Sequence, residues 1–335
     1  GVIIGVLPGL GATTGAALLL PFTLTMDPVH AIAVLATIYV SATFAGSITA
    51  ILINTPGTSA AAATTFDGYP LAQKGEAGRA LGIAVISSTV GGIFSVLILC
   101  FAAPLLARVA YEFRSPEYFA LTVFGLSMLA SISAGGAVKN LIGGIFGVWL
   151  STIGAERVPG IERFMFGNYE LYEGLHFVPI FIGLFAISEL LVQSKTVDKI
   201  IKTVSMQAVK LPTKEDYKKI WKTILRSCGI GTFIGVLPAE GATVASMIGY
   251  SEARRWSKNK KEFGKGSIEG IAGAEAANNA ATGGAMVPTM VLGIPGSGTT
   301  AIILVGLMVH GLRPGVYLFT CLLYTSPSPR DYIAS

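Results

Sequence analysis

The stretch GVLPGLGAT (residues 5–13) recurs as GVLPAEGAT (residues 235–243), 230 residues further along the chain, with seven of nine positions identical. Proline lacks a backbone N–H and clashes with the preceding helical turn, and glycine is entropically costly inside a helix. Each copy lies in an apolar segment, so each predicts a break in an otherwise continuous helix. Because the pattern occurs twice, the sequence indicates an internal duplication.

A second motif follows each copy in the same order. LINTPGTSAAA (residues 52–62) is similar to VLGIPGSGTTA (residues 291–301), since both place Pro-Gly and small hydroxyl residues after an apolar run. Each is followed by an exit rich in glycine and proline, FDGYP (residues 66–70) or VHGLRPG (residues 309–315). Two motifs that recur in one order support the duplication more strongly than either alone.

The composition is that of a membrane protein. Of the 335 residues, 52% are hydrophobic and 13% charged, with a mean hydropathy of +0.66, whereas an average soluble domain has about 25% charged residues. A helix needs roughly 20 apolar residues to cross a bilayer. We therefore expect an all-α integral membrane protein, a polytopic helix bundle with full spans at 28–53, 80–107, 117–133, 138–154 and 175–192, separated by polar loops at 67–79, 108–116 and 155–174.

Basic residues gather in two segments. Residues 193–226 hold nine Lys and Arg against three acidic residues, and residues 254–265 hold six more Lys and Arg. The positive-inside rule assigns both loops to the cytoplasm, so topology explains the net charge of +5 better than a nucleic-acid partner does. The apolar stretch between them, 227–250, must then enter and return as a re-entrant hairpin. The alternative is one kinked span with one basic loop outside.

The odd number of spans between the two hairpins predicts how the repeats are related. Five full spans separate the two hairpins, so the first hairpin enters from the side opposite the second, which makes an inverted repeat of the kind found in secondary transporters. We expect a first repeat region at 1–75, connecting spans and a basic cytoplasmic loop at 76–226, and a second repeat region at 227–323. Residues 324–335 are polar, proline-rich and aperiodic, which suggests a non-native tail; the alternative is a natural polar tail.

Broken helices can bind ions at the ends where the helix is interrupted. Free N–H groups and the positive end of the dipole at a half-helix start attract a carboxylate, and freed carbonyls can hold a cation. Residues 8–13, 55–59, 238–243 and 295–300 form four such breaks. The hydroxyl and glycine candidates for substrate binding in them are Thr58, Gly241, Thr243 and Ser297.

Polar residues near the breaks are further candidates. Asn278 and Asn279 precede the fourth break, where they could bind substrate or a coupling cation, or only hydrogen-bond a neighbouring helix. Glu240 lies in the second hairpin tip, and Glu275 lies just before the two asparagines. Intramembrane carboxylates are candidates for cation or proton coupling, although a water-exposed Glu240 without a role is the alternative.

Enzymatic signatures are missing from the sequence. GIPGSGTT (residues 293–300) imitates a phosphate loop, but Thr299 stands where that motif requires lysine. The cysteines and histidines have no metal-ligand spacing, and no nucleophile motif is present. We therefore expect no enzyme, no metal site and no cofactor, and transport that draws on an ion gradient or on substrate flux.

Three long segments make the chain recognisable. Residues 5–28, 46–75 and 263–315 resemble the large membrane subunit of the tripartite tricarboxylate transporter family, and the resemblance extends over nearly all of residues 1–318. Family members are longer at both ends, so the chain looks like a fragment. The motif residues carried over by position are Gly9, Gly11, Thr13, Asn54, Pro56, Gly57, Asn278, Asn279, Pro295 and Gly296.

The resemblance implies a function. It implies a multi-pass translocation subunit in the bacterial inner membrane that works with a small membrane subunit and a periplasmic solute-binding protein. Uptake of citrate or related organic carboxylates would be secondary active, driven by H⁺ or Na⁺ symport. In the family the second hairpin commonly reads Pro-Gly where this chain has Ala239 and Glu240, which leaves the substrate and the coupling ion open.

Two other functions remain as hypotheses. A channel or pore for small anions could also use hairpins that face each other, and conductance without saturation would distinguish it from a carrier. A membrane enzyme or scaffold would accumulate no solute, and the sequence offers it no catalytic constellation.

Overall fold

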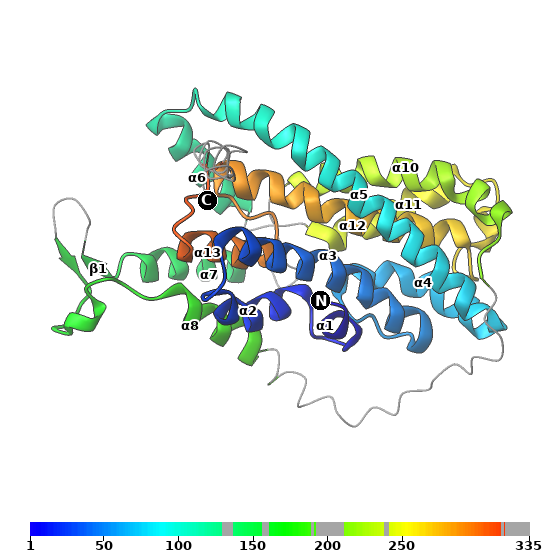
Figure 1. The fold of residues 1–335 in the computed structure, drawn as a ribbon, viewed down its shortest axis with the longest axis horizontal. Coiled ribbons are helices and arrows are strands. Elements are labelled where there is room, and N and C mark those ends of the chain that lie inside the picture. The colour runs from blue at the N-terminus through cyan, green and yellow to red at the C-terminus, as the bar shows by residue number, and fades with distance from the viewer. Residues whose placement is uncertain are drawn as a thin grey trace, which may run out of the picture.

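The computed structural model describes residues 1–128, 137–155, 161–188, 191, 211–237, 241–315 and 318. The described chain is mostly helical, as predicted, and its long helices lie side by side along the long axis of the molecule (Figure 1). The strands in this part are the short antiparallel pair β1 (Gly154–Ala155) and β2 (Glu162–Arg163), within the loop expected at 155–174. The predicted tail at 324–335 and most of the basic loop lie outside the described residues.

Helix α12 (Ile268–Leu292) is the central element, and nearly all of its residues are buried. Glycines on its neighbours explain how closely they pack: a Cβ on Gly91 of α5 (Ala77–Ala110) would collide with the Ala276 carbonyl. Gly231 of α10 (Lys214–Val236) contacts the Ala277 carbonyl in the same way. Small residues allow helix backbones to approach closely, as is common in membrane helix bundles.

The first repeat region forms a short broken helix and a long one. α1 (Val2–Val6) and α2 (Ala12–Thr23) flank the first break, and α3 (Pro28–Ile53) coincides with the first predicted span. The side chain of Asp27 caps the start of α3 by accepting a hydrogen bond from Val29 N. The second break follows α3, and the chain resumes as η1 (Ser59–Ala61) and α4 (Ala62–Leu71).

The prediction of a polar loop at 67–79 is wrong, because these residues are helical. α4 continues through η2 (Ala72–Glu76), a π-helical turn, directly into α5. The chain changes direction at Gly75, whose φ of 80° lies in the region that glycine adopts most readily. A single left-handed glycine therefore supplies the bend for which the sequence suggested a loop.

The third break separates α10 from α11 (Gly241–Trp256), and these two helices form a hairpin. Near one end of this hairpin, Lys219 Nζ lies 3.4 Å from Glu262 Oε2, and the Arg226 guanidinium lies 5.1 Å from the centroid of the Trp256 ring. The two helices therefore run antiparallel. α10 begins at Lys214, behind a capping box of Thr213 and Asp216, so the last part of the loop expected at 193–226 is helical instead.

Two helical segments of the described residues are long and apolar enough to cross a membrane, Pro28–Ile53 and Ser59–Ala110, the second of which bends at Gly75. Shorter apolar helices include Ala12–Thr23, Val138–Ser151 and Gly298–Val309. The remaining helices and turns are α6 (Ser115–Met128), α7 (Ala137–Ser151), η4 (Tyr169–Leu171), α8 (Phe177–Phe181), η5 (Ile182–Ile187), η6 (Lys260–Glu262) and α13 (Gly298–Val309). The predicted spans at 117–133 and 175–192 run partly outside the described residues.

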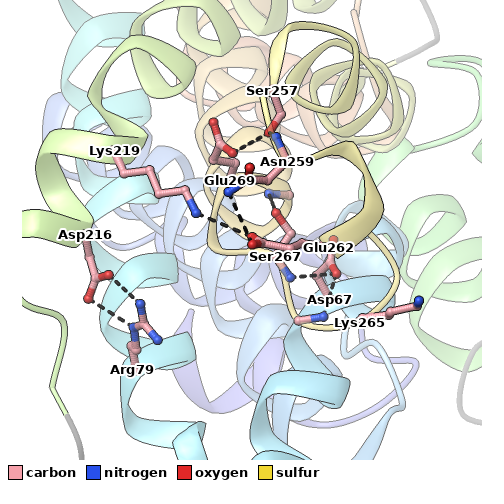
Figure 2. A network of polar contacts seen from close by, with 12 residues as sticks. Asp67, Arg79, Asp216, Lys219, Ser257, Asn259, Glu262, Lys265, Ser267 and Glu269 are labelled. Carbon is pink, nitrogen blue, oxygen red and sulfur yellow. Dashed lines mark hydrogen bonds and ion pairs between the residues drawn. The ribbon is translucent and has the colours of Figure 1, made fainter.

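A polar network joins the start of α12 to its neighbours at one end of the bundle (Figure 2). Asp67 of α4 accepts hydrogen bonds of 2.8 Å from Gly266 N and Ser267 N. Arg79 of α5 donates to both carboxylate oxygens of Asp216 on α10. This network fixes the relative positions of α4, α5, α10 and α12 on the side where the sequence predicts cytoplasm.

Candidate functional site

The first hairpin tip is held against the break after α3. Gly9 has a φ of 87°, and its N–H donates to the Gly57 carbonyl at 3.2 Å. A Cβ on Gly57 would collide with the Gly5 carbonyl oxygen and would also meet Gly46. Only glycine therefore fits at position 57, because three backbone segments meet there.

The second repeat reproduces this contact with its own residues. Gly296 lies 239 positions after Gly57, and a Cβ on it would meet Ala285 and, at 3.1 Å, the Gly235 carbonyl oxygen. Gly235 is the equivalent of Gly5 in the first motif, 230 residues further on. Ala285 is the equivalent of Gly46 by the offset of the second motif, 239 residues further on. The two halves of the duplication thus use equivalent residues for equivalent packing.

The ends of the two long helices are also equivalent. α3 ends at Asn54, with φ 55°, and α12 ends at Gly293, with φ 70°, so both end residues are left-handed. The Asn54 N–H donates to the Thr49 carbonyl, and the Gly293 N–H donates to the Pro288 carbonyl, again 239 residues on. Asn54 is exposed and terminates its helix without lining a cavity.

A cavity of about 200 Å³ lies where the four breaks meet. Its lining consists of small and hydroxyl residues from the starts of α2, η1, α11 and α13, together with two residues of α3. The lining residues are Gly11, Ala12, Thr13, Tyr39, Thr43, Thr58, Ser59, Ala60, Gly241, Ala242, Thr243, Ser297, Gly298 and Thr299. None of these side chains carries a formal charge.

Two hydroxyl pairs connect the repeats across this cavity. Thr13 Oγ1 lies 2.9 Å from Thr299 Oγ1, and Ser59 Oγ lies 2.9 Å from Thr243 Oγ1. Thr13 and Thr243 are equivalent positions of the two hairpin motifs. Each hairpin therefore contacts the break of the other repeat.

Backbone groups give the cavity its electrostatic character. The first N–H groups of a helix have no partner within it, and the helix dipole makes that end positive. The N-cap of α2 is Gly11, which provides no side-chain hydrogen bond to those N–H groups. Several helix starts converging on a cavity whose described lining residues are uncharged favour an anionic ligand.

Thr58 lines the cavity, but its hydroxyl is packed against α3. Its Oγ1 is buried, lies where a Cβ on Gly46 would collide with it, and makes no hydrogen bond to the described part of the chain. A buried hydroxyl without a partner costs free energy of about 1–3 kcal/mol.

A larger cavity of about 420 Å³ continues from the first on the side of η5. It shares Gly11, Thr13, Thr58 and Ser59 with the smaller cavity and adds Gly9, Pro56 and Gly57. Of the predicted substrate-binding residues, the two cavities thus bring together Gly9, Gly11, Thr13, Pro56, Gly57, Thr58, Gly241, Thr243 and Ser297.

The paired asparagines lie behind the cavity. Both are buried, and Asn278 Nδ2 donates to the carbonyl of Ala60 at 3.3 Å. Asn279 Nδ2 donates to Asn278 Oδ1 at 2.7 Å. The pair therefore positions a lining residue through its backbone. Pro295 and Gly296 likewise shape the fourth break without lining the cavity.

The two carboxylate candidates have different outcomes. Glu240 lies outside the described residues. Glu275 is completely buried in α12, where its carboxylate accepts hydrogen bonds from Thr64 and, at 2.8 Å, from Ser88. It does not line either cavity.

The sequence reasoning missed four hydroxyl-bearing residues of the smaller cavity: Tyr39, Thr43, Ser59 and Thr299. The Tyr39 hydroxyl accepts a hydrogen bond from Ser297 Oγ at 3.2 Å. The duplication could have identified Tyr39, because it lies 239 residues before Asn278. Both residues contact the break of the other repeat.

Comparison with known proteins identifies the family of this chain. The family model "Tripartite tricarboxylate transporter TctA family" matches residues 1–325. An uncharacterised 52.8 kDa protein in the TAR-I ttuC' 3' region of Agrobacterium vitis is 42% identical over 317 residues, which are 94% of this chain and 63% of that protein. The chain therefore spans less than two thirds of that relative.

A second Agrobacterium vitis protein, uncharacterised and in the TAR-II ttuC' 3' region, is 43% identical over 90 residues, 27% of this chain and 37% of that protein. No solved structure matches the chain. The family match covers nearly the whole chain and agrees with the apolar helices. The chain belongs to the TctA family of tripartite tricarboxylate transporters, a family of membrane transporters and not of enzymes.

Proposed function

We propose that this chain is the translocation subunit of a secondary active tripartite transporter that imports tricarboxylates or related organic acids, with the 200 Å³ cavity as its substrate site. The observation that carries the proposal is the convergence of four helix starts, from both repeats, on one uncharged cavity. Such a site suits a carboxylate because it offers N–H donors and hydroxyls without a basic side chain that would hold the anion too tightly for release.

The repeats suggest how the substrate lies. The Gly-Ala-Thr segments at 11–13 and 241–243 border the cavity from the two halves of the chain. A carboxylate at either segment would accept hydrogen bonds from helix-start N–H groups and from the hydroxyls of lining residues such as Thr13 and Thr243. Two carboxylates of one substrate can thus be bound by equivalent elements.

Alternating access follows from the same arrangement. Each hairpin tip contacts the other repeat through one hydroxyl pair, Thr13 with Thr299 or Ser59 with Thr243. These pairs are small and uncharged, so they can separate when one bundle moves against the other. The equivalent packing of Gly57 and Gly296 supports an inverted repeat with two re-entrant hairpins.

The remaining components follow from the family. We infer a multi-pass protein of the bacterial inner membrane, in contact with lipid and with a small membrane subunit, that receives substrate from a periplasmic solute-binding protein. An H⁺ or Na⁺ gradient drives uptake, with Glu240 and Glu275 as the coupling candidates. Nucleic acid has no part in this function.

Uptake of a panel of labelled carboxylates by the complete subunit and its partners tests the proposal. Saturable uptake that collapses with an ionophore is expected. Thr243→Val and Ser297→Ala, both at residues that line the cavity, should strongly reduce uptake while membrane insertion persists, and Thr89→Val, on the exposed surface of α5, should transport normally. Normal uptake by both site variants would contradict the site assignment, and conductance without saturation would indicate a channel.

A further inference from the structure

Glu275 is a fully buried carboxylate at the centre of the bundle. It lies on α12, and its two oxygens are bound by hydroxyls from two other helices, Thr64 of α4 and Ser88 of α5. The Asn278 amide is a third polar neighbour. Three helices therefore meet at one titratable side chain that neither cavity uses.

The partners of Glu275 in the described part of the chain are uncharged. A carboxylate removed from water without a basic partner carries a large desolvation cost, which hydroxyl donors offset only partly. Intramembrane acidic side chains in such surroundings mark ion or proton pathways. The desolvation cost of the Glu275 carboxylate therefore indicates that this residue has a function other than packing.

The interactions of the Glu275 carboxylate in the described residues involve no other titratable group. Asp67 of α4 and Tyr250 of α11 approach Gly270, more than one turn before Glu275. Cys228 of α10 packs in an apolar cluster, and Tyr39 of α3 lies at the cavity. Glu275 is thus a separate site.

We propose that Glu275 is a proton-binding site that couples substrate movement in the cavity to a proton gradient. This inference rests on the proposed function. The proton comes from the aqueous phase and adds to one carboxylate oxygen, and no other bond is made or broken. The packing favours a proton over a metal cation, because the carboxylate and hydroxyl oxygens are in direct hydrogen-bond contact, whereas a coordinated cation would hold them apart.

Protonation would be transmitted to the cavity through two connections. A neutral carboxylic acid donates one hydrogen bond, so one of its three polar neighbours, Thr64, Ser88 or Asn278, must then act as acceptor. Thr64 lies in the helix that starts at the second break, little more than one turn after Ala60. Asn278, beside Glu275, donates to the Ala60 carbonyl at 3.3 Å, and Ala60 lines the cavity.

Transport by Glu275→Gln tests the coupling. Glutamine resembles the protonated acid in shape and keeps a hydrogen-bond donor and acceptor. In vesicles that contain the complete subunit and its partners, Glu275→Gln should lose substrate accumulation driven by a pH gradient by about tenfold or more. It should keep exchange of labelled for unlabelled substrate, since exchange needs no net proton movement. The matched control is Glu269→Gln, on the same helix but bonded to Ser257 in the terminal network, and it should keep both activities.

Accumulation by Glu275→Gln equal to wild type would overturn the proposal. Loss of exchange together with accumulation would also overturn it, because the residue would then be needed for the structure of the site. Failure of the wild-type protein to transport any carboxylate would instead contradict the proposed function.

Infrared difference spectra give a readout that does not depend on transport. Spectra of the full chain between mildly alkaline and mildly acidic pH should contain a carboxylic acid C=O band that Glu275→Gln lacks and Glu269→Gln keeps. If wild type and Glu275→Gln gave the same carboxylic acid C=O bands, Glu275 would not take up a proton in this pH range.

Discussion

The hydroxyl oxygens of Thr13 and Thr299 lie 2.9 Å apart, although 286 residues separate them in the chain. Thr13 is in the first turn of α2, and Thr299 is in the first turn of α13. The contact therefore joins the helix starts of two different repeats. Neither half of the duplication builds the cavity by itself.

Removing this hydroxyl pair should weaken the contact between the repeats. We expect Thr13→Val and Thr299→Val each to reduce uptake, and the double variant to lose less than the sum of the single effects. The coupling free energy should be about 0.5–1.5 kcal/mol, the range of a neutral hydrogen bond. Uptake measured over the double-mutant cycle checks this, with Thr89→Val as the control. Strictly additive effects would mean that the hydroxyls act independently.

Substitution of Gly57 should destabilise the first break. Because a Cβ there collides with the Gly5 carbonyl, Gly57→Ala should lower the free energy of unfolding by about 1–3 kcal/mol, as overpacking does. Gly147→Ala is the control, since a Cβ on Gly147 of α7 meets no atom within 4 Å and alanine favours the helix. Thermal unfolding of the purified variants compares the two. Equal midpoints for Gly57→Ala and wild type would contradict the close approach.

The Arg79–Asp216 pair should contribute to stability at neutral pH. Asp216 is 7% exposed, and Arg79 donates two hydrogen bonds to it. Asp216→Asn should therefore cost about 2 kcal/mol, as for a hydrogen-bonded charged group. The Arg255–Glu252 pair at the surface provides the control, because water screens its charges and Glu252→Gln should cost much less than Asp216→Asn.

The pH dependence of this pair has a definite sign. Burial would raise the pKa of Asp216, but hydrogen bonds from Arg79 and Thr213 bring it below its usual range. The stabilisation is then complete above the unfolded-state pKa of about 3.9 and is lost as the pH falls through the lower folded-state pKa. The difference in unfolding temperature between wild type and Asp216→Asn should shrink on acidification. A difference that grows at low pH would refute this assignment.

The hairpin of α10 and α11 should have both ends on one side of the membrane. With the native cysteines replaced by serine, single cysteines at Lys218 and Lys260, both exposed, should react with an impermeant reagent only from the cytoplasm. A cysteine at Tyr169, in the loop predicted outside, should react only from the opposite side. Reaction at Lys218 and Lys260 from different faces would eliminate the re-entrant hairpin and the inverted repeat.

Local patterns predicted much of the fold. The apolar run at 28–53 is one helix, and the two Pro-Gly motifs do interrupt helices after Ile53 and Leu292. The loop expected at 67–79 failed because one left-handed glycine, Gly75, provides the turn between two helices. Composition could not distinguish that bend from a loop, since both use glycine, proline and charged residues.

The candidate site was predicted in outline. Residues in the breaks, such as Thr13 and Thr58, line the cavity because a broken helix exposes its first turn. For Asn278 the sequence left open substrate binding, cation binding or a hydrogen bond to a neighbouring helix, and its side chain donates to the Ala60 carbonyl. The direction of a polar side chain on a helix buried on all sides depends on its neighbours, which no local pattern contains.

The sequence by itself determined that helices break at four matched places, because proline, glycine and hydroxyl residues act on the backbone locally. Only the tertiary structure decided which breaks meet. Thr13 pairs with Thr299, Ser59 pairs with Thr243, and Glu275 lies between Thr64 and Ser88. These contacts depend on how closely helix backbones approach α12, and that distance is set by glycines and alanines on several helices together.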